Sequence, residues 1–484
     1  METLSRRQFL ASTAAFGALS FAPSLITHTA AFAGPSPTII RAEKRVIEVG
    51  KRAASVLGLV QPDGQHGIIT DAGKPFRIRL DNGLDDPTLI HWHGLLPPFG
   101  QDGVPDLPQP LLQPGQGYDY DFPLETPGTH WMHAHTLQEQ QLLAAPLIVN
   151  DPAEAGLDEQ PVVVLLHDFS FRTPEELLVE LTGAGGMAGH GGMSNMSRMA
   201  GHNMSGMSEA SGAMSMDIND IDYDAYLAND RTLDDPQVFS VERGGTVRLR
   251  LINGATATAF WIDTGALAGE AIAVDGNAVE PVRRNRFPLG MGQRIDIRVR
   301  IPKQAGAWPI LALREGAEER TGFFLATADG LIKRLPTAGN EKAAPLDIEL
   351  EGSLRAIRPI KPVEVARRQE LVLGGGMDGY VWTLNGKIWG KHDPLPVSPG
   401  ERVEVTLRND SMMGHPMHLH GHHFQVVAID GRPFAGAVRD TVWLPPMRAL
   451  TVAFNADNPG TWAFHCHHLY HMATGMMTVV EYAT

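Results

Sequence analysis

The stretch from Ala463 to Met477 concentrates side chains that bind metals. It holds the only cysteine of the chain, Cys466, with His471 five residues later and Met476 five residues after that. A cysteine thiolate, two imidazoles and a weak axial thioether are the ligands of a blue-copper electron-transfer site. The stretch supplies three of these ligands, so one more histidine must come from elsewhere in the chain.

Two further histidines, His465 and His467, flank the cysteine. Successive residues of a β-strand point to opposite faces. If FHCHH is extended, Cys466 faces one metal ion and both neighbours face another metal behind it. The tripeptide would then be a short covalent connection between two metal sites.

Pairs of histidines separated by one residue recur along the chain, and on a strand both rings of such a pair project from one face. The pairs are His91 and His93, His133 and His135, His418 and His420, and His465 and His467. Eight imidazoles suit three metal ions, one with two histidines and a pair with six. Imidazole alone does not select the metal, but a cysteine–methionine site selects copper. His415 supplies the missing histidine of that site.

The positioning elements are predicted to be short strands. Alternation of polar and apolar residues with period two predicts strands at 76–80, 246–251, 294–300 and 402–407, and a short apolar run predicts another at 145–149. Pro174–Leu181 is the best helix candidate, because Glu175 and Glu176 suit a first turn. Regular short strands without long helical periodicity indicate an all-β protein of sandwich domains.

The length of 484 residues indicates about three domains of roughly 150 residues each. We place them at 34–155, 156–338 and 339–484. Residues 183–216 form an insertion rich in glycine, serine and methionine, whose composition cannot build a packed core. The middle domain has no H-x-H pair and is expected to bridge rather than to bind metal.

Residues 1–33 are predicted to be an export signal. SRRQFL at 5–10 is a twin-arginine motif, an apolar run follows, and AFA at 31–33 is a small-residue cleavage site. An uncleaved anchor is the less favoured alternative, since serine, threonine, glycine and proline interrupt the run. We therefore expect a folded protein exported to the periplasm, without a membrane span in the mature chain.

The net charge of −15 argues against a nucleic-acid partner and against a basic surface for anionic lipid. One cysteine leaves no internal disulfide. We expect the protein to be a monomer.

Four motifs, in this order, resemble the signature motifs of the multicopper oxidase family, which includes laccases, ascorbate oxidase and bacterial cuprous oxidases. They are HWHG at 91–94, HAH at 133–135, HPMHLHG at 415–421 and HCHHLYHMATGM at 465–476. The resemblance covers essentially the whole mature chain. It implies three cupredoxin-like Greek-key β-sandwich domains and four copper ions, with dioxygen reduced to water.

The resemblance also implies a role for each ligand. Type 1 copper falls to His415, Cys466, His471 and Met476, type 2 copper to His91 and His418, and the type 3 pair to His93, His133, His135, His420, His465 and His467. Electrons from a reducing substrate would enter at type 1 copper and pass inward through Cys466 and its neighbours.

Reduction of dioxygen to water also needs protons. Asp102 matches an acid that the family places shortly after HWHG, although an Asp-Gly turn is the plainer interpretation. Many members carry a second acid directly after the last type 1 histidine, where this chain has Met472. Water or another residue must then deliver protons on that side, and Glu139 is a candidate that the sequence does not favour.

The methionines of the insertion suggest the reducing substrate, since soft thioethers select Cu(I). Candidate ligands for it are Met187, Met193, Met196, Met199, Met204 and Met207, together with Met413 two residues before His415. The alternatives are a linker with incidental methionines, and Met413 as a core residue or a wall of the type 1 pocket.

We therefore expect an oxidase of Cu(I) that protects against copper. A laccase-like oxidase of phenols or aromatic amines, or of Mn(II) or Fe(II), is the alternative enzyme. A non-enzymatic copper-sequestering protein is the alternative of another class, but storage of copper does not need the complete set of eight clustered histidines.

Overall fold

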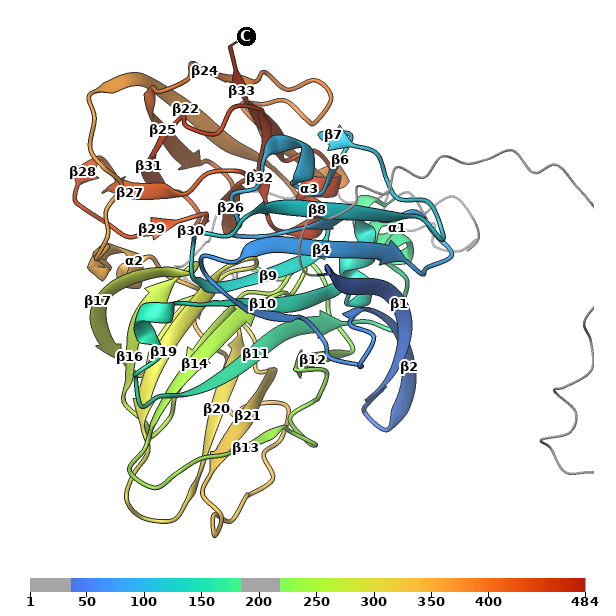
Figure 1. Ribbon diagram of the computed structural model, residues 1–484, viewed down its shortest axis with the longest axis vertical. Helices are drawn as coiled ribbons and strands as arrows, with labels where there is room; N and C mark the ends of the chain where they lie inside the picture. Colours follow the sequence, from blue (N-terminus) through green and yellow to red (C-terminus); the bar gives the residue numbers. More distant parts are fainter. Residues whose placement is uncertain (1–35, 184–217, 484) are drawn as a thin grey trace, which may run out of the picture. The chain divides into compact units, whose positions relative to one another are not determined.

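The computed structural model describes residues 36–183 and 218–483, which are built mainly of β-strands (Figure 1). The strands form three successive pairs of sheets. We call residues 34–155 the first region, 156–338 the middle region and 339–484 the last region. The export signal and the candidate methionines from Met187 to Met207 lie outside the described residues.

The first region has two four-stranded sheets. One has the order β2 (Arg52–Val60), β1 (Thr38–Val49), β4 (Pro75–Asn82) and β8 (Gly117–Pro123). The other has the order β3 (Ile68–Asp71), β10 (Ala144–Asn150), β9 (Gly128–Ala134) and β5 (Ile90–His91). β6 (Val104–Pro105) and β7 (Pro108–Gln109) pair separately. One apolar core includes buried side chains from both larger sheets, as a β-sandwich requires.

The middle region repeats this arrangement with more strands. Its first sheet has the order β12 (Ala225–Ala228), β11 (Gln160–Phe169), β14 (Thr246–Asn253), β19 (Arg294–Arg300), β16 (Gly269–Val274) and β17 (Asn277–Arg284). Its second has the order β13 (Val238–Ser240), β21 (Arg320–Ala326), β20 (Ala307–Arg314), β15 (Phe260–Asp263) and β18 (Arg286–Leu289). Apolar side chains of both sheets share a second core.

The last region carries the third pair of sheets. One contains β23 (Val381–Leu384), β22 (Val365–Gly376), β25 (Arg402–Asn409), β31 (Ala449–Asn455), β27 (Phe424–Ile429) and β28 (Arg432–Pro433), with β29 (Val438–Arg439) also paired to β27. The other contains β24 (Leu395–Val397), β33 (Met477–Tyr482), β32 (Thr461–Cys466), β26 (His415–Leu419) and β30 (Thr441–Leu444). Their shared core includes Cys466 and Met476.

Helices are short. They are α1 (Pro174–Thr182), α2 (Glu349–Ser353), α3 (Leu469–Ala473) and the 3-10 turns η1 (Phe99–Gln101), η2 (Leu137–Gln141), η3 (Pro152–Glu154) and η4 (Asp378–Tyr380). α1 begins with a capping box, in which Thr173 and Glu176 exchange hydrogen bonds between side chain and backbone. Its predicted position is confirmed, as are the predicted strands, now β4, β10, β14, β19 and β25.

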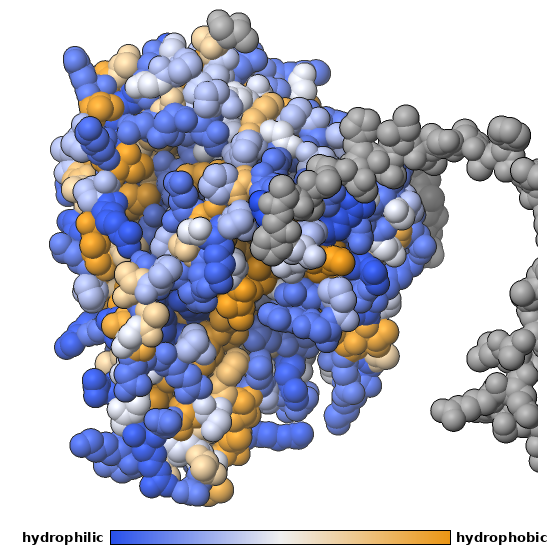
Figure 2. Space-filling model, in the orientation of Figure 1, coloured by the Kyte–Doolittle hydropathy of each residue, from blue (hydrophilic) through white to orange (hydrophobic). Residues whose placement is uncertain are grey.

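Residues 37–484 form one compact unit, so the domain boundaries stay predictions. The face in Figure 2 mixes abundant hydrophilic side chains with scattered hydrophobic ones, as usual for a folded protein in water. Among the described residues, no helix has the length and hydropathy needed to cross a bilayer.

Candidate metal centre

Strand pairing brings the four H-x-H pairs together in two halves. In the first region β5 pairs with β9, which sets His91 opposite His133. In the last region β26 pairs with β32, which sets His418 opposite His465. Each half therefore presents the rings of two pairs from neighbouring strands.

The two halves meet, and we call the resulting eight rings the histidine cluster. The members are His91, His93, His133, His135, His418, His420, His465 and His467, all of them buried. Between the regions, His91 Nε2 lies 3.4 Å from His418 Nε2, and His135 Nε2 lies 3.3 Å from His465 Nε2. Within them, His420 Nε2 is 2.9 Å from His465 Nε2, and His93 Nδ1 is 3.4 Å from His133 Nε2.

In three of these rings Nδ1 has a hydrogen-bond partner, which leaves Nε2 available to a metal ion. Nδ1 lies 2.9 Å from the Asp102 carbonyl oxygen in His91, 2.9 Å from the Asp440 carbonyl oxygen in His418 and 2.9 Å from the Cys466 carbonyl oxygen in His465. A carbonyl can only accept, so each Nδ1–H donates and each Nε2 keeps its lone pair. Histidines that ligate metals are commonly held in this way.

His467 offers a second sign that the histidine cluster holds metal. Both of its ring nitrogens are buried without a hydrogen-bond partner among the described residues. Burial, with further repulsion from neighbouring histidines, lowers the pKa of His467, His93 and His135 well below the ordinary value. Neutral imidazole is the form that binds metal, so the donor set fits several transition-metal ions.

A second group lies on the other side of β32, and we call it the thiolate site: His415, Cys466, His471 and Met476. The Cys466 sulfur is 3.6 Å from His415 Nδ1 and 3.7 Å from His471 Nδ1, and these two nitrogens are 3.2 Å apart. A triangle of this size has corners about 2 Å from its centre, the usual length of a metal–nitrogen bond. Burial raises the pKa of the Cys466 thiol, so a bound cation is needed to hold it as thiolate.

Met476 is fully buried in the core that contains Cys466. Its backbone is fixed on both sides, because its N–H donates to the His471 carbonyl and its carbonyl accepts from Cys466 N–H. The pattern of one sulfur, two imidazoles and a neighbouring thioether fits a blue-copper site.

The thiolate site and the histidine cluster share one piece of chain. Cys466 ends β32, and His465 and His467 on either side of it belong to the histidine cluster. The His467 N–H donates to the Pro416 carbonyl across 2.6 Å, which extends the contact with β26 beyond the end of the strand. Cys466 therefore connects the two sites covalently.

Asp102 lies at the histidine cluster. Its carboxylate oxygen Oδ2 is 2.8 Å from His420 Nδ1, while its carbonyl binds His91. The Asp-Gly turn is also real: a Cβ at Gly103, where φ is +88°, would lie 1.8 Å from the Ile90 carbonyl oxygen. One loop thus links a carboxylate to histidines of both regions.

Glu139, which the sequence did not favour, is also at the histidine cluster. Its Oε2 lies 3.0 Å from His133 Nδ1, and burial raises its pKa well above the ordinary value. The signal was its position four residues after His135, in the turn η2 that packs against α3. Met472 lies on that helix and is partly buried against Cys466's core.

Asp220 was not identified from the sequence. Its Oδ2 lies 3.0 Å from His471 Nε2 and 3.3 Å from His468 Nε2, and it accepts a hydrogen bond from the Tyr380 hydroxyl. Burial disfavours its charge, but the hydrogen bonds from His468 and His471 outweigh that effect and lower the pKa of Asp220. No local pattern marks this single aspartate, which stands just after the insertion.

Met413 is buried in the same core as the thiolate site, and Ser411 stands between it and a ligand. The Ser411 hydroxyl is 2.7 Å from His415 Nε2. Met412 is 61% exposed and turns toward solvent instead. Met413 thus lies in the core that contains Cys466 and Met476, and its part in binding Cu(I) stays a prediction.

The chain is similar to known proteins. Three family profiles described as multicopper oxidase match residues 64–154, 162–328 and 363–484. Multicopper oxidase MmcO of Mycobacterium tuberculosis is 33% identical over 85% of this chain and 80% of its own length. Copper resistance protein A of Escherichia coli is 26% identical over 84% of this chain and 86% of its own.

Among solved structures, a multi-copper oxidase from Pseudomonas thermotolerans superposes with a TM-score of 0.69. It is 24% identical, and the match covers 92% of this chain and 98% of that one. At this identity the likeness shows the cupredoxin-like fold alone.

Buried neutral histidines make the metal-free protein sensitive to acid. Burial is the main cause that lowers the pKa of His465 to about 4 and that of His471 to about 3. In the unfolded chain both would bind a proton near pH 6.5. The unfolded state then binds more protons between pH 6.5 and 4, so we expect the urea midpoint of the metal-free protein to fall as pH drops through this range.

A His465→Asn variant isolates the effect. Its midpoint should change less between pH 7 and 5 than that of the unaltered protein, because one group fewer changes protonation on unfolding. Burial raises the pKa of Glu315 to about 7, so this residue makes stability change with pH in the opposite direction. The effect is the same in both proteins and cancels in the comparison. Equal slopes in the two proteins would contradict the prediction.

Cys466→Ser tests the connection between the sites. We expect the copper-loaded variant to lack the blue absorption band and to lose turnover of reducing substrates to background, since the hard hydroxyl replaces the soft thiolate ligand. Copper should still bind to the histidine cluster, so metal analysis should find about one ion fewer per chain. Normal turnover by this variant would refute the connection.

Proposed function

The chain belongs to the multicopper oxidase family, and from this premise we propose that it oxidises Cu(I) to Cu(II) with dioxygen and so protects the cell against copper. It is an oxidoreductase that uses oxygen and binds four copper ions. The site of action in this proposal is the periplasm, because residues 1–33 carry the features of a twin-arginine export signal.

Each site has a distinct part in this proposal. The thiolate site holds type 1 copper, His91 and His418 hold type 2 copper, and the other six members of the histidine cluster hold the type 3 pair. Bound copper supplies one-electron acceptance at the thiolate site and reduction of dioxygen to water at the histidine cluster. Cys466 carries electrons between them through its bonds to His465 and His467.

Two buried carboxylates are placed to deliver protons. Asp102 hydrogen-bonds to His420 from one side, and Glu139 hydrogen-bonds to His133 from another. In this proposal Glu139 takes the role of the second proton donor, which the methionine side chain of Met472 cannot perform. In our proposal both carboxylates pass protons from solvent to the oxygen-reducing site.

The observation that carries Cu(I) as substrate is the packing of the described residues on both sides of the methionine-rich insertion. Before it, Leu177 of α1 packs into the core that contains Cys466, and after it Ile221 packs into the same core. Asp220 binds the ligand His471 directly. The described residues that flank the insertion on both sides therefore pack into the core of the thiolate site. The thioethers of the insertion suit Cu(I).

The relative named copper resistance protein A supports a copper substrate. A laccase-like oxidase of phenols remains the alternative, because a blue-copper site accepts electrons from many donors. The two differ in what the insertion does. A Cu(I) oxidase needs it to capture the substrate, whereas a phenol needs only access to the thiolate site.

Deletion of residues 184–216 separates these functions. Gly183 and Asp217 would be joined by a short glycine-serine linker, which keeps Asp220 and Ile221 in the chain. We expect turnover of Cu(I) to fall and turnover of a phenol to stay equal or rise, measured as dioxygen consumption. A matched control replaces the eight methionines by leucine and keeps the length.

The leucine control should lose Cu(I) turnover as the deletion does, because leucine has no thioether. An equal loss of turnover with Cu(I) and with the phenol would exclude a role of the insertion in capturing Cu(I). So would unchanged Cu(I) turnover in either variant.

Asp102→Asn tests the proton path. The amide keeps the size of the carboxylate but cannot carry a proton, so we expect kcat to fall by about a hundredfold or more. The blue absorption and the copper content should be retained. Asp106→Asn, at an exposed position four residues further along the chain, is the control and should leave kcat unchanged. Equal kcat in the two variants would contradict the role of Asp102.

A further inference from the structure

A turn of the middle region, 290–294, packs against the histidine cluster. A Cβ at Gly292, where φ is +76°, would lie 2.7 Å from the His467 ring, so only glycine allows this approach. The Gln293 side chain donates to the Thr441 carbonyl across 3.2 Å. The next residue, Arg294, is completely buried.

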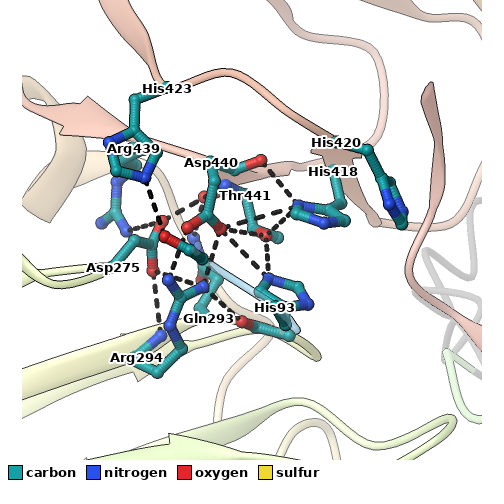
Figure 3. Close-up of polar contacts among 12 residues, drawn as sticks. His93, Asp275, Gln293, Arg294, His418, His420, His423, Arg439, Asp440 and Thr441 are labelled. Atoms are coloured by element: carbon teal, nitrogen blue, oxygen red, sulfur yellow. Dashed lines mark hydrogen bonds and ion pairs between the residues drawn. The ribbon is translucent and has the colours of Figure 1, made fainter. Parts of the chain in front are cut away.

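Arg294 holds Asp440 of the last region with both of its terminal nitrogens (Figure 3). Its Nη1 is 2.7 Å from Asp440 Oδ1, and Nη2 donates to Oδ2. The Nε–H of Arg294 donates to the Thr129 carbonyl of the first region across 3.2 Å. One guanidinium thus ties all three regions together beside the histidine cluster.

Asp440, held in this way, contacts two predicted copper ligands from different regions. Its Oδ1 is 3.1 Å from His93 Nε2, and its carbonyl oxygen is 2.9 Å from His418 Nδ1. The Thr441 hydroxyl donates to Asp440 Oδ1 and lies 3.1 Å from His93 Nε2 and 3.0 Å from His418 Nδ1. The stacked rings of His93 and His418, 3.8 Å apart, share this support.

The arrangement fixes which nitrogen of His93 can bind metal. Since Nε2 faces an acceptor carboxylate, it carries the proton and leaves the Nδ1 lone pair pointing at His133 Nε2. In His418 the opposite holds, because Nδ1 donates to a carbonyl. Two neighbouring rings are thereby held in opposite tautomers, which spacing along the chain cannot specify.

Asp440 itself is not a good metal ligand, although it lies with His93 and His418 within the reach of one ion. Oδ1 already receives Arg294, Thr441 and His93, and Oδ2 receives Arg294. Burial disfavours its charge, but Arg294 outweighs that effect and lowers the pKa of Asp440. The carboxylate therefore stays ionised, and hydrogen bonds already occupy both of its oxygens.

Gly94 of the HWHG motif makes room for the pair. A Cβ there, where φ is +93°, would lie 2.5 Å from Arg294 Nη2 and 3.3 Å from Asp440 Oδ2. The close approach of Arg294 and Asp440 therefore explains why a glycine, Gly94, follows the two histidines of the HWHG motif.

We propose that Asp440, held by Arg294 of the middle region, is a positioning residue for the copper cluster, which orients His93 and His418 for metal binding. The middle region, which supplies none of the predicted ligands, then controls the affinity of the histidine cluster for copper. This inference rests on the proposed assignment of copper to that cluster.

The test compares Asp440→Asn with Asp275→Asn, two isosteric changes in one buried network. Asp275 accepts hydrogen bonds from the backbone N–H groups of Arg294 and Thr441 and lies 3.1 Å from Arg439 Nη1. Among the described residues it contacts no predicted ligand. We expect Asp440→Asn to weaken copper binding at the histidine cluster by about 10- to 100-fold, as loss of a partner of a metal ligand commonly does. Asp275→Asn should keep the cluster copper and lower only the urea midpoint of the metal-free protein.

The readouts are copper per chain after dialysis against a chelator, the electron paramagnetic resonance signal of type 2 copper, and the blue band of the thiolate site. An unchanged blue band in Asp440→Asn shows that the protein has folded. The inference is overturned if Asp440→Asn retains its cluster copper, or if Asp275→Asn loses as much. Absence of cluster copper from the unaltered protein would instead refute the copper assignment itself.

Two milder variants cover the case in which Asp440→Asn does not fold. Arg294→Lys keeps the charge but loses the two-pronged contact, and Thr441→Val removes the hydroxyl shared by both rings. Each should weaken cluster copper while the blue band persists. Cluster copper equal to that of the unaltered protein in both variants would overturn the inference.

Discussion

The alternation of side chains along β32 is the constraint on which the rest of the structure depends. Because Cys466 must face one site and His465 another, the two sites have to lie back to back across a single strand. The partners of Cys466 then come from the same sandwich, at His415 and His471. His465 meets His420 of its own region and also His135 from across an interface. One site belongs to the last region, and the other requires the first and last regions to meet.

An interface that must hold eight neutral rings in fixed orientations cannot rely on apolar packing alone. The protein places buried carboxyl groups behind the rings, at Asp102, Glu139 and Asp440. An unpaired buried charge would be costly, so each is hydrogen-bonded, and Arg294 neutralises Asp440. The middle region is therefore part of the metal site through the residues behind the ligands, which extends the bridging role expected of it.

The parts of the structure that depend on local pattern could be predicted from the sequence. Period-two alternation gave the strands at 246–251 and 402–407, and H-x-H spacing identified rings that the structure brings together. Residues behind those rings could not be predicted, since Arg294 meets Asp440 across 146 positions and His471 meets Asp220 across 251. Such contacts depend on how the sandwiches pack, and a lone Asp or Arg carries no periodic signal.

Ligands for the histidine cluster are spread from His91 to His467, and the middle region lies between them along the chain. During synthesis, the first half of this metal site emerges from the ribosome long before its complement exists. A growing chain can offer metal ions only incomplete sets of imidazoles, so correct loading has to follow translation of residue 467. The order of biosynthesis thereby makes assembly of the histidine cluster a late step, which a truncated polypeptide cannot complete.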